Sequence, residues 1–221
     1  GRAAYTAFLD SEDDPASFFE NKLQYIEDRF SFFNEDYREL TNSLAGISKS
    51  NGLEFGLVQF QDSDEIFGFV RYIVPNSNAT SANIQRGDLF TGVDGQTLTI
   101  DNYIGLLFGD NDTYTLNMAD FENGNIVPNE EEVTLTKEEG LAENPVFLSK
   151  SFTIAGENIG YIMYNQFTNE YDDDLYAAVQ DLKSAGITNL VMDLRYNPGG
   201  SVNTTRLLAS MIYGTNTSDI F

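Results

Sequence analysis

The pattern of apolar and polar positions changes character twice along the chain, near residues 48 and 140. In residues 1–48, apolar side chains such as Phe18 and Leu23 recur at roughly helical spacing. Asp13-Asp14-Pro15 has the composition of a helix start, and residues 35–44 predict a second helix that stops before Gly46. This block therefore predicts a small helical segment.

Residues 49–140 show short apolar runs separated by turn residues, which is typical of strands. Asp94-Gly95 signals a tight turn, and a long acidic loop is expected through residues 122–132. A short helix is expected at 79–84, and Asp101 is expected to cap another that runs to Phe108. The predicted strands are 53–60, 66–74, 89–93, 114–121 and 133–137.

Residues 141–221 predict a hairpin, a helix, a buried strand and a second helix. The hairpin strands are 152–155 and 159–164, the first helix begins at 172–174 and ends near Gly186, and the buried strand is 190–194. Because a parallel β-α-β unit needs further strands to bury both faces, this block reads as an incomplete core. The expected fold class is α+β and multi-domain, with domains at 1–48, 49–140 and 141–221.

The amino-acid composition excludes several classes of catalytic and binding site. The chain of 221 residues is 41% apolar, which fits a globular protein, and no apolar run approaches the length of a membrane helix. With no Cys and no His, the sequence excludes thiol catalysis, His-dependent triads and zinc sites built on these residues. The net charge of −23 argues against a nucleic-acid partner. No cofactor or metal site is expected.

The segment Asp193-Leu194-Arg195-Tyr196-Asn197-Pro198-Gly199-Gly200 joins a strand to a helix through a glycine-rich turn. Two glycines let a substrate carbonyl approach the backbone, and free N–H groups at a helix start favour a developing negative charge. This is the geometry of an oxyanion hole. The same residues would also suit an ordinary strand-to-helix turn, and Asp193 with Arg195 suits a structural ion pair.

This segment resembles the DLR-x-N-x-GG motif of the C-terminal processing (tail-specific) serine proteases, family S41. Asn158-Ile159-Gly160-Tyr161-Ile162 resembles the strand that precedes the motif in that family. The resemblance implies a crotonase-like α/β protease core in which a backbone amide of Gly199 or Gly200 contributes to the oxyanion hole.

A second stretch, from Arg71 to Gly95, resembles a bacterial PDZ domain through Val74-Pro75-Asn76-Ser77-Asn78-Ala79, Ile84-Gln85-Arg86-Gly87-Asp88-Leu89-Phe90 and Val93-Asp94-Gly95. The resemblance implies a peptide-binding groove built by strand addition, with its loop at Gly52, Leu53, Glu54 and Phe55. Tyr103 and Leu107, one helical turn apart, are candidate groove walls or, alternatively, plain core residues. Glu54 stands where the family has Gly, and an acidic side chain beside a carboxylate nest would oppose a free C-terminus. An internal segment could bind instead.

The family resemblance also implies a Ser nucleophile and a Lys general base, both well downstream of the Gly-Gly turn. No Ser or Lys of this chain stands in that relation. Ser149 and Lys150 are adjacent in a predicted strand and so point to opposite faces, and Ser201 suits a helix cap. We therefore expect no catalytic nucleophile within the chain, and no cleavage by this chain alone.

The leading hypothesis is thus a serine-type endopeptidase of extracytoplasmic polypeptides, located in the periplasm or cell envelope. A lipid anchor upstream of residue 1 and the oligomeric state are left open. One alternative is a non-catalytic PDZ-type peptide-binding module. Another is a crotonase-like acyl-CoA enzyme, although no basic phosphate site is evident in the sequence.

Overall fold

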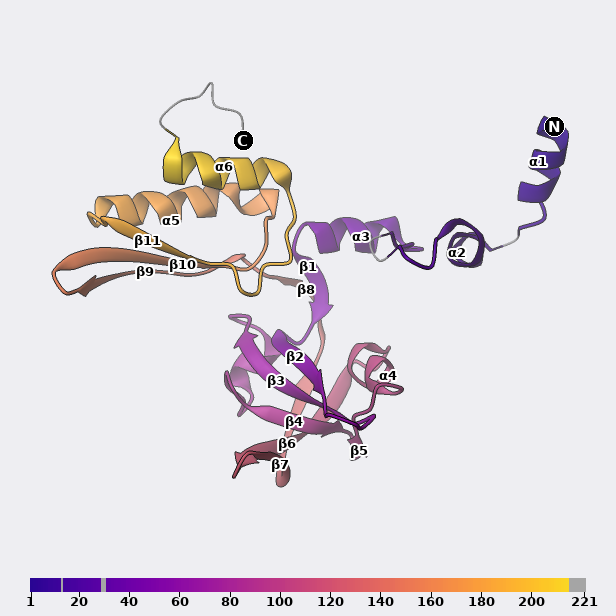
Figure 1. The fold of residues 1–221 in the computed structure, drawn as a ribbon, viewed down its shortest axis with the longest axis horizontal. Helices are drawn as coiled ribbons and strands as arrows, with labels where there is room; N and C mark the ends of the chain where they lie inside the picture. The colour runs from indigo at the N-terminus through magenta and orange to yellow at the C-terminus, as the bar shows by residue number, and fades with distance from the viewer. Residues whose placement is uncertain (13, 29–30, 215–221) are drawn as a thin grey trace. The chain divides into compact units, whose positions relative to one another are not determined.

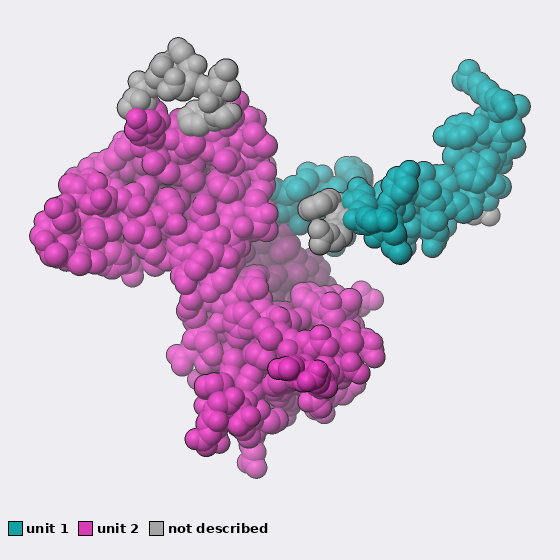
Figure 2. Space-filling model, in the orientation of Figure 1, with its two compact units in different colours: residues 1–44 teal, residues 45–221 magenta. Residues whose placement is uncertain are grey.

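The computed structural model describes residues 1–12, 14–28 and 31–214. The chain falls into two units, Gly1–Leu44 and Ala45–Phe221, coloured separately in Figure 2. Among the described residues, no helix is both long and apolar enough to cross a membrane.

The first unit consists of short helical segments: α1 (Arg2–Leu9), α2 (Pro15–Phe18), the π-helical η1 (Phe19–Leu23) and α3 (Tyr37–Leu44). Asp14 caps α2 by accepting hydrogen bonds from the backbone of Ala16 and Ser17, as the helix-start signal predicted, whereas Asp13 lies outside the described residues. Helical periodicity does not continue to Ile26, because the chain turns extended at Gln24 and leaves Ile26 95% exposed. The predicted helix in residues 35–44 is confirmed.

A six-stranded sheet dominates residues 53–136 (Figure 1). Its order is β2-β3-β4-β6-β7 with β5 paired to β4, and all pairs are antiparallel. Buried side chains such as Leu53, Val70 and Phe90 form its core together with helix α4 (Tyr103–Phe108). The strands are β2 (Leu53–Gln59), β3 (Ile66–Ile73), β4 (Leu89–Val93), β5 (Gln96–Thr97), β6 (Thr113–Glu122) and β7 (Asn125–Thr136).

Three expectations for this region are wrong. The acidic loop at 122–132 is a hairpin, because Asn123-Gly124 makes a two-residue turn at positive φ and β7 starts directly afterwards. The helix expected at 79–84 is a single 3-10 turn, η2 (Asn78–Ser81), with Ser77 at its N-cap. Helix α4 has Asn102, not Asp101, at the N-cap position.

A two-stranded antiparallel ribbon joins this sheet to the rest of the unit. It pairs β1 (Ile47–Ser50) with β8 (Glu138–Ala142). The domain boundaries proposed from the sequence, after residues 48 and 140, both fall within these two strands. The ribbon therefore carries the chain both into and out of the six-stranded sheet.

The C-terminal part confirms the predicted β-α-β-loop-α unit. Strands β9 (Val146–Ile154) and β10 (Glu157–Tyr164) form an antiparallel hairpin, and β11 (Asn189–Asp193) pairs parallel to β10. The 3-10 turn η3 (Asn169–Tyr171) leads into α5 (Asp172–Ser184), and α6 (Val202–Tyr213) follows β11. Figure 1 shows α5 and α6 on the same side of this sheet, where Leu175 of α5 packs with Ile162 and Tyr164 of β10 in a buried cluster.

Candidate functional site

The glycine-rich turn lies between the carboxyl end of β11 and the start of α6. Gly199 and Gly200 have φ values of 115° and 131°, a region of backbone space that favours glycine. Ser201 is the N-cap of α6, and its hydroxyl oxygen accepts the backbone N–H of Thr204 at 3.2 Å. The cap expected at Ser201 is therefore confirmed, and the turn opens a helix as predicted.

Hydrogen bonds from two sides fix this turn. On one side, Asn197 donates its Nδ2 to the Tyr164 carbonyl at 3.0 Å and accepts the Gly199 N–H at its Oδ1 at 2.8 Å. On the other, Phe167 N–H donates to the Gly199 carbonyl at 2.9 Å, and Ser201 N–H donates to the Phe167 carbonyl at 2.7 Å. The turn is thus held against the segment that follows β10.

This bonding pattern distinguishes the two glycine amides. The Gly199 N–H is already used by Asn197, whereas the Gly200 N–H has no acceptor among the described residues. It lies one residue before the N-cap of α6, where the helix dipole favours negative charge. Of the two amides predicted from the sequence, Gly200 is the one free to donate to a ligand oxygen.

Sterics explain why position 200 requires glycine. A Cβ added there would lie 2.2 Å from the carbonyl oxygen of Phe167, whereas a Cβ at Gly199 would meet no atom within 4 Å. The close approach of Gly200 to the Phe167 backbone is therefore possible only without a side chain. No local pattern in the sequence singles out Phe167 as the partner of the turn.

An ion pair stabilises the end of β11. The Arg195 guanidinium donates to both carboxylate oxygens of Asp193, at 2.6–3.1 Å, and the Tyr161 hydroxyl donates to the same carboxylate at 2.5 Å. The hydrogen bonds from Arg195 hold the pKa of Asp193 well below its ordinary value. Asp193 is 8% exposed, so its charge needs these partners. The structural role expected for this pair agrees with the geometry.

A second site lies between β2 and α4, and we call it the β2–α4 groove. It is a pocket of about 240 Å³. Because β2 forms one edge of the six-stranded sheet, its outer backbone groups have no neighbouring strand among the described residues. Leu53, Glu54, Phe55 and Leu107 border the pocket, as do Lys49, Ser50, Asn51, Phe108, Tyr114 and Lys137.

The other groove residues predicted from the sequence lie around this pocket or behind it. Gly52 immediately precedes β2 and has φ of 80°. Leu107 borders the pocket but is only 2% exposed, so it is also a core residue. Tyr103 packs against the core and does not border the pocket. The structure thus brings the predicted loop and Leu107 together, and it leaves Tyr103 in the alternative core role.

Glu54, which borders the groove, also belongs to a polar cluster with Arg71, Tyr72 and Glu143. Its cross-strand neighbour is Tyr72, whose hydroxyl donates to Glu143 at 2.9 Å. Burial raises the pKa of Glu54 to about 7, the negative charge of Glu143 adds to the rise, and Arg71 opposes it. The electrostatic partners of this carboxyl are therefore Glu143 and Arg71, rather than the backbone amides of a carboxylate nest.

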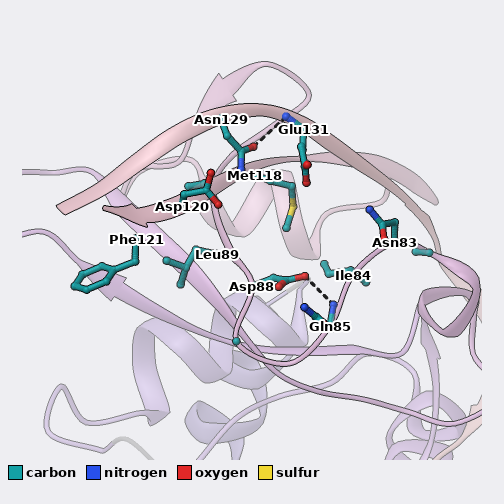
Figure 3. A pocket seen from close by; sticks show the side chains of 13 residues that line it. Asn83, Ile84, Gln85, Asp88, Leu89, Met118, Asp120, Phe121, Asn129 and Glu131 are labelled. Carbon is teal, nitrogen blue, oxygen red and sulfur yellow. Dashed lines mark hydrogen bonds between the residues drawn. The ribbon is translucent and has the colours of Figure 1, made fainter. Parts of the chain in front are cut away.

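A further pocket, of about 400 Å³, lies between the loop at 82–89 and the paired ends of β6 and β7 (Figure 3). Its acidic side chains are Asp88, Asp120 and Glu131. Asp88 accepts the Gln85 N–H at 2.8 Å and so stabilises the turn in which it lies. None of the candidate binding or oxyanion residues predicted from the sequence borders this pocket. The described part of the chain holds no group of side chains suited to a metal ion.

Comparisons with known proteins bear on the glycine turn directly. Residues 158–219 match peptidase family S41. A carboxyl-terminal-processing protease of Synechocystis sp. is 27% identical over 169 residues, which are 75% of this chain and 38% of that protein. One of Picosynechococcus sp. is 26% identical over 198 residues, which are 85% of this chain and 45% of that protein.

The fold is also found among solved structures. A crystal structure from Bacteroides fragilis assigned to the S41 proteases superposes with a TM-score of 0.64 at 28% identity, covering 90% of this chain and 51% of that one. The chain therefore spans about half, or less, of the proteins it matches. The resemblance to family S41 drawn from the sequence is confirmed: residues 158–219 of this chain match peptidase family S41, and the chain is similar to carboxyl-terminal-processing proteases.

Proposed function

We propose that the chain is the N-terminal part of a serine-type endopeptidase that processes polypeptides outside the cytoplasm, in the periplasm or cell envelope. The observation that carries the proposal is the unused Gly200 N–H at the entrance to α6, within the segment that matches family S41. The Ser nucleophile and the Lys base belong, on this proposal, to sequence beyond the segment described here. This chain contributes the oxyanion donor.

The chemistry expected at Gly200 follows from where charge develops. When a nucleophile attacks a peptide carbonyl, its oxygen becomes negative, and a fixed N–H donor stabilises that charge more than it stabilises the neutral carbonyl. The start of α6 adds the positive end of a helix dipole. Because Asn197 and Phe167 hold the turn rigidly, the donor needs little reorganisation during the reaction.

The β2–α4 groove is the proposed contact for the polypeptide. An extended segment could add to the free edge of β2 through backbone hydrogen bonds, with apolar side chains against Leu53, Phe55 and Leu107. This groove also favours a second candidate function, a peptide-binding module without catalysis, because it needs nothing from the glycine turn. The two candidates differ in whether Gly200 matters for turnover.

The test compares two proteins: this 221-residue chain and the native polypeptide isolated from its source. Each is incubated with fluorescently labelled unfolded casein. We expect turnover only by the native polypeptide. Gly200→Ala in it keeps the backbone N–H, but the new Cβ would lie 2.2 Å from the Phe167 carbonyl oxygen and so displace the amide. The expected loss in kcat is up to about 10²–10³-fold, the usual effect of losing one oxyanion donor. Gly156→Ala is the matched control, since Gly156 also has positive φ (86°) but lies in the β9–β10 turn with open space around its Cβ.

The outcomes of this test distinguish the protease from the peptide-binding module. Turnover by the 221-residue chain itself would refute its expected inactivity. A native polypeptide with no proteolytic activity, but with peptide binding that Phe55→Ala weakens, would establish the binding module instead. Equal kcat for Gly200→Ala and Gly156→Ala would remove Gly200 from the catalytic machinery.

A further inference from the structure

Tyr196 lies within the motif, between β11 and the glycine turn, and it makes contacts that the motif alone does not explain. Its ring centroid is 5.6 Å from that of Tyr72, a residue of β3 in the six-stranded sheet. The guanidinium carbons of Arg71 and Arg86 lie 5.7 Å and 5.5 Å from the same centroid. The ring of Tyr196 is thus contacted by two side chains of β3 and by one from the loop between β3 and β4.

These contacts form a connected cluster. Arg86 donates from its guanidinium to the Arg71 carbonyl at 3.0 Å, which ties the two arginines together. Tyr72 also packs on Phe147 of β9, with ring centroids 4.9 Å apart, so the ring that meets Tyr196 is itself held in place. Guanidinium groups stack well on aromatic faces, because the negative face of the ring attracts the delocalised cation.

The surrounding charge makes two arginines at one ring tolerable. Arg71 interacts with the Glu54 carboxyl, and the chain as a whole carries a net charge of −23. Arg71 also has room because position 56 of β2 is glycine: a Cβ there would lie 3.0 Å from the Arg71 guanidinium. Arg195 approaches Tyr196 too, at 5.8 Å, but Asp193 already holds it, so it is not part of this cluster.

Tyr196 directly precedes Asn197, the residue that bonds the Gly199 N–H and the Tyr164 carbonyl. We infer that Tyr196 is a positioning residue, through which Arg71 and Tyr72 of β3 and Arg86 of the β3–β4 loop fix the Gly199–Gly200 turn. The catalytic meaning of this inference rests on the proposed function. The contacts by which the sheet holds the turn in place do not depend on that function.

The experiment measures amide hydrogen exchange by NMR in the ¹⁵N-labelled 221-residue chain, at Gly199 and Ser201, the two amides whose bonds define the turn. In Tyr196→Leu and in the double variant Arg71→Gln/Arg86→Gln, we expect both amides to exchange about five- to tenfold faster, as follows from losing cation–π and ring contacts. Tyr196→Phe keeps the ring and should exchange like the wild type. Arg206→Gln, which removes an exposed charge on α6, is the control.

The amide of Val179, in the buried face of α5, reports on global stability in the same spectra. An increase at Gly199 and Ser201 with no change at Val179 supports the inference. Equal acceleration at all three amides, or wild-type exchange at the turn in the double arginine variant, overturns it. If Tyr196→Leu does not fold, the double variant still decides. Failure of the proposed function would show separately, as absence of casein cleavage by the native polypeptide.

Discussion

Replacing Gly200 with Ala is expected to destabilise the C-terminal sheet far more than replacing Gly156. Both glycines have positive φ, and an L-residue there costs about 1–2 kcal/mol. Only at Gly200 does the new Cβ collide with backbone, at 2.2 Å from the Phe167 carbonyl oxygen. That oxygen accepts the Ser201 N–H at 2.7 Å, so it moves only if this bond and the bond from Phe167 N–H to the Gly199 carbonyl lengthen.

Two backbone hydrogen bonds contribute about 0.5–1.5 kcal/mol each, so Gly200→Ala should lower the free energy of unfolding by about 1–3 kcal/mol more than Gly156→Ala. The assay is urea unfolding followed by far-UV circular dichroism, since the chain has no Trp. Gly156 joins β9 to β10 in the same sheet, so both variants report on the same structure. Agreement of the two values within about 0.5 kcal/mol would refute the steric argument.

Three further predictions concern stability. Burial raises the pKa of Glu54 from 4.5 to about 7, so the folded chain binds this proton more tightly than the unfolded chain. The free energy of unfolding should therefore fall by about 3 kcal/mol as the pH rises from 4.5 to 7. Glu54→Gln should flatten this slope in urea titrations at pH 4–8. Tyr72→Phe removes the 2.9 Å donor to Glu143 and should cost about 1–3 kcal/mol in urea unfolding; no loss would show that the bond contributes nothing. Ser201→Ala should cost about 1 kcal/mol by loss of the cap to Thr204, and Ser201→Asp should restore it in thermal unfolding.

Local sequence signals predicted the elements that depend on nearby residues. Strand β4 has the predicted bounds, and α5 begins at the three aspartates, because propensity and end charges agree there. The prediction of a loop at 122–132 was wrong because the acidic run at 130–132 was taken as a loop signal. In the structure these glutamates lie on β7, an outer strand of the sheet, where charged side chains can face solvent.

In the candidate site, too, local sequence predicted the local geometry but not the contacts made by distant residues. The strand–turn–helix geometry around Gly199 and Gly200 follows from the residues of the turn itself. Which of the two amides stays free depends on Asn197, and the turn is held in place by Phe167, more than thirty positions earlier in the chain. The pattern at Tyr103 and Leu107 could not separate groove from core, because both roles need an apolar side chain on the same helix.

The parallel pairing of β11 has a consequence for the order in which this sheet assembles. The hairpin of β9 and β10 closes over a two-residue turn, whereas β11 meets β10 only after α5, with partners such as Ile159 and Asn189 thirty positions apart. Local contacts form faster than contacts that close long loops, so the hairpin is expected to fold before β11 docks. The turn at Gly199–Gly200 lies beyond β11, and its hydrogen bonds to Phe167 and Tyr164 should therefore form only after β11 has docked.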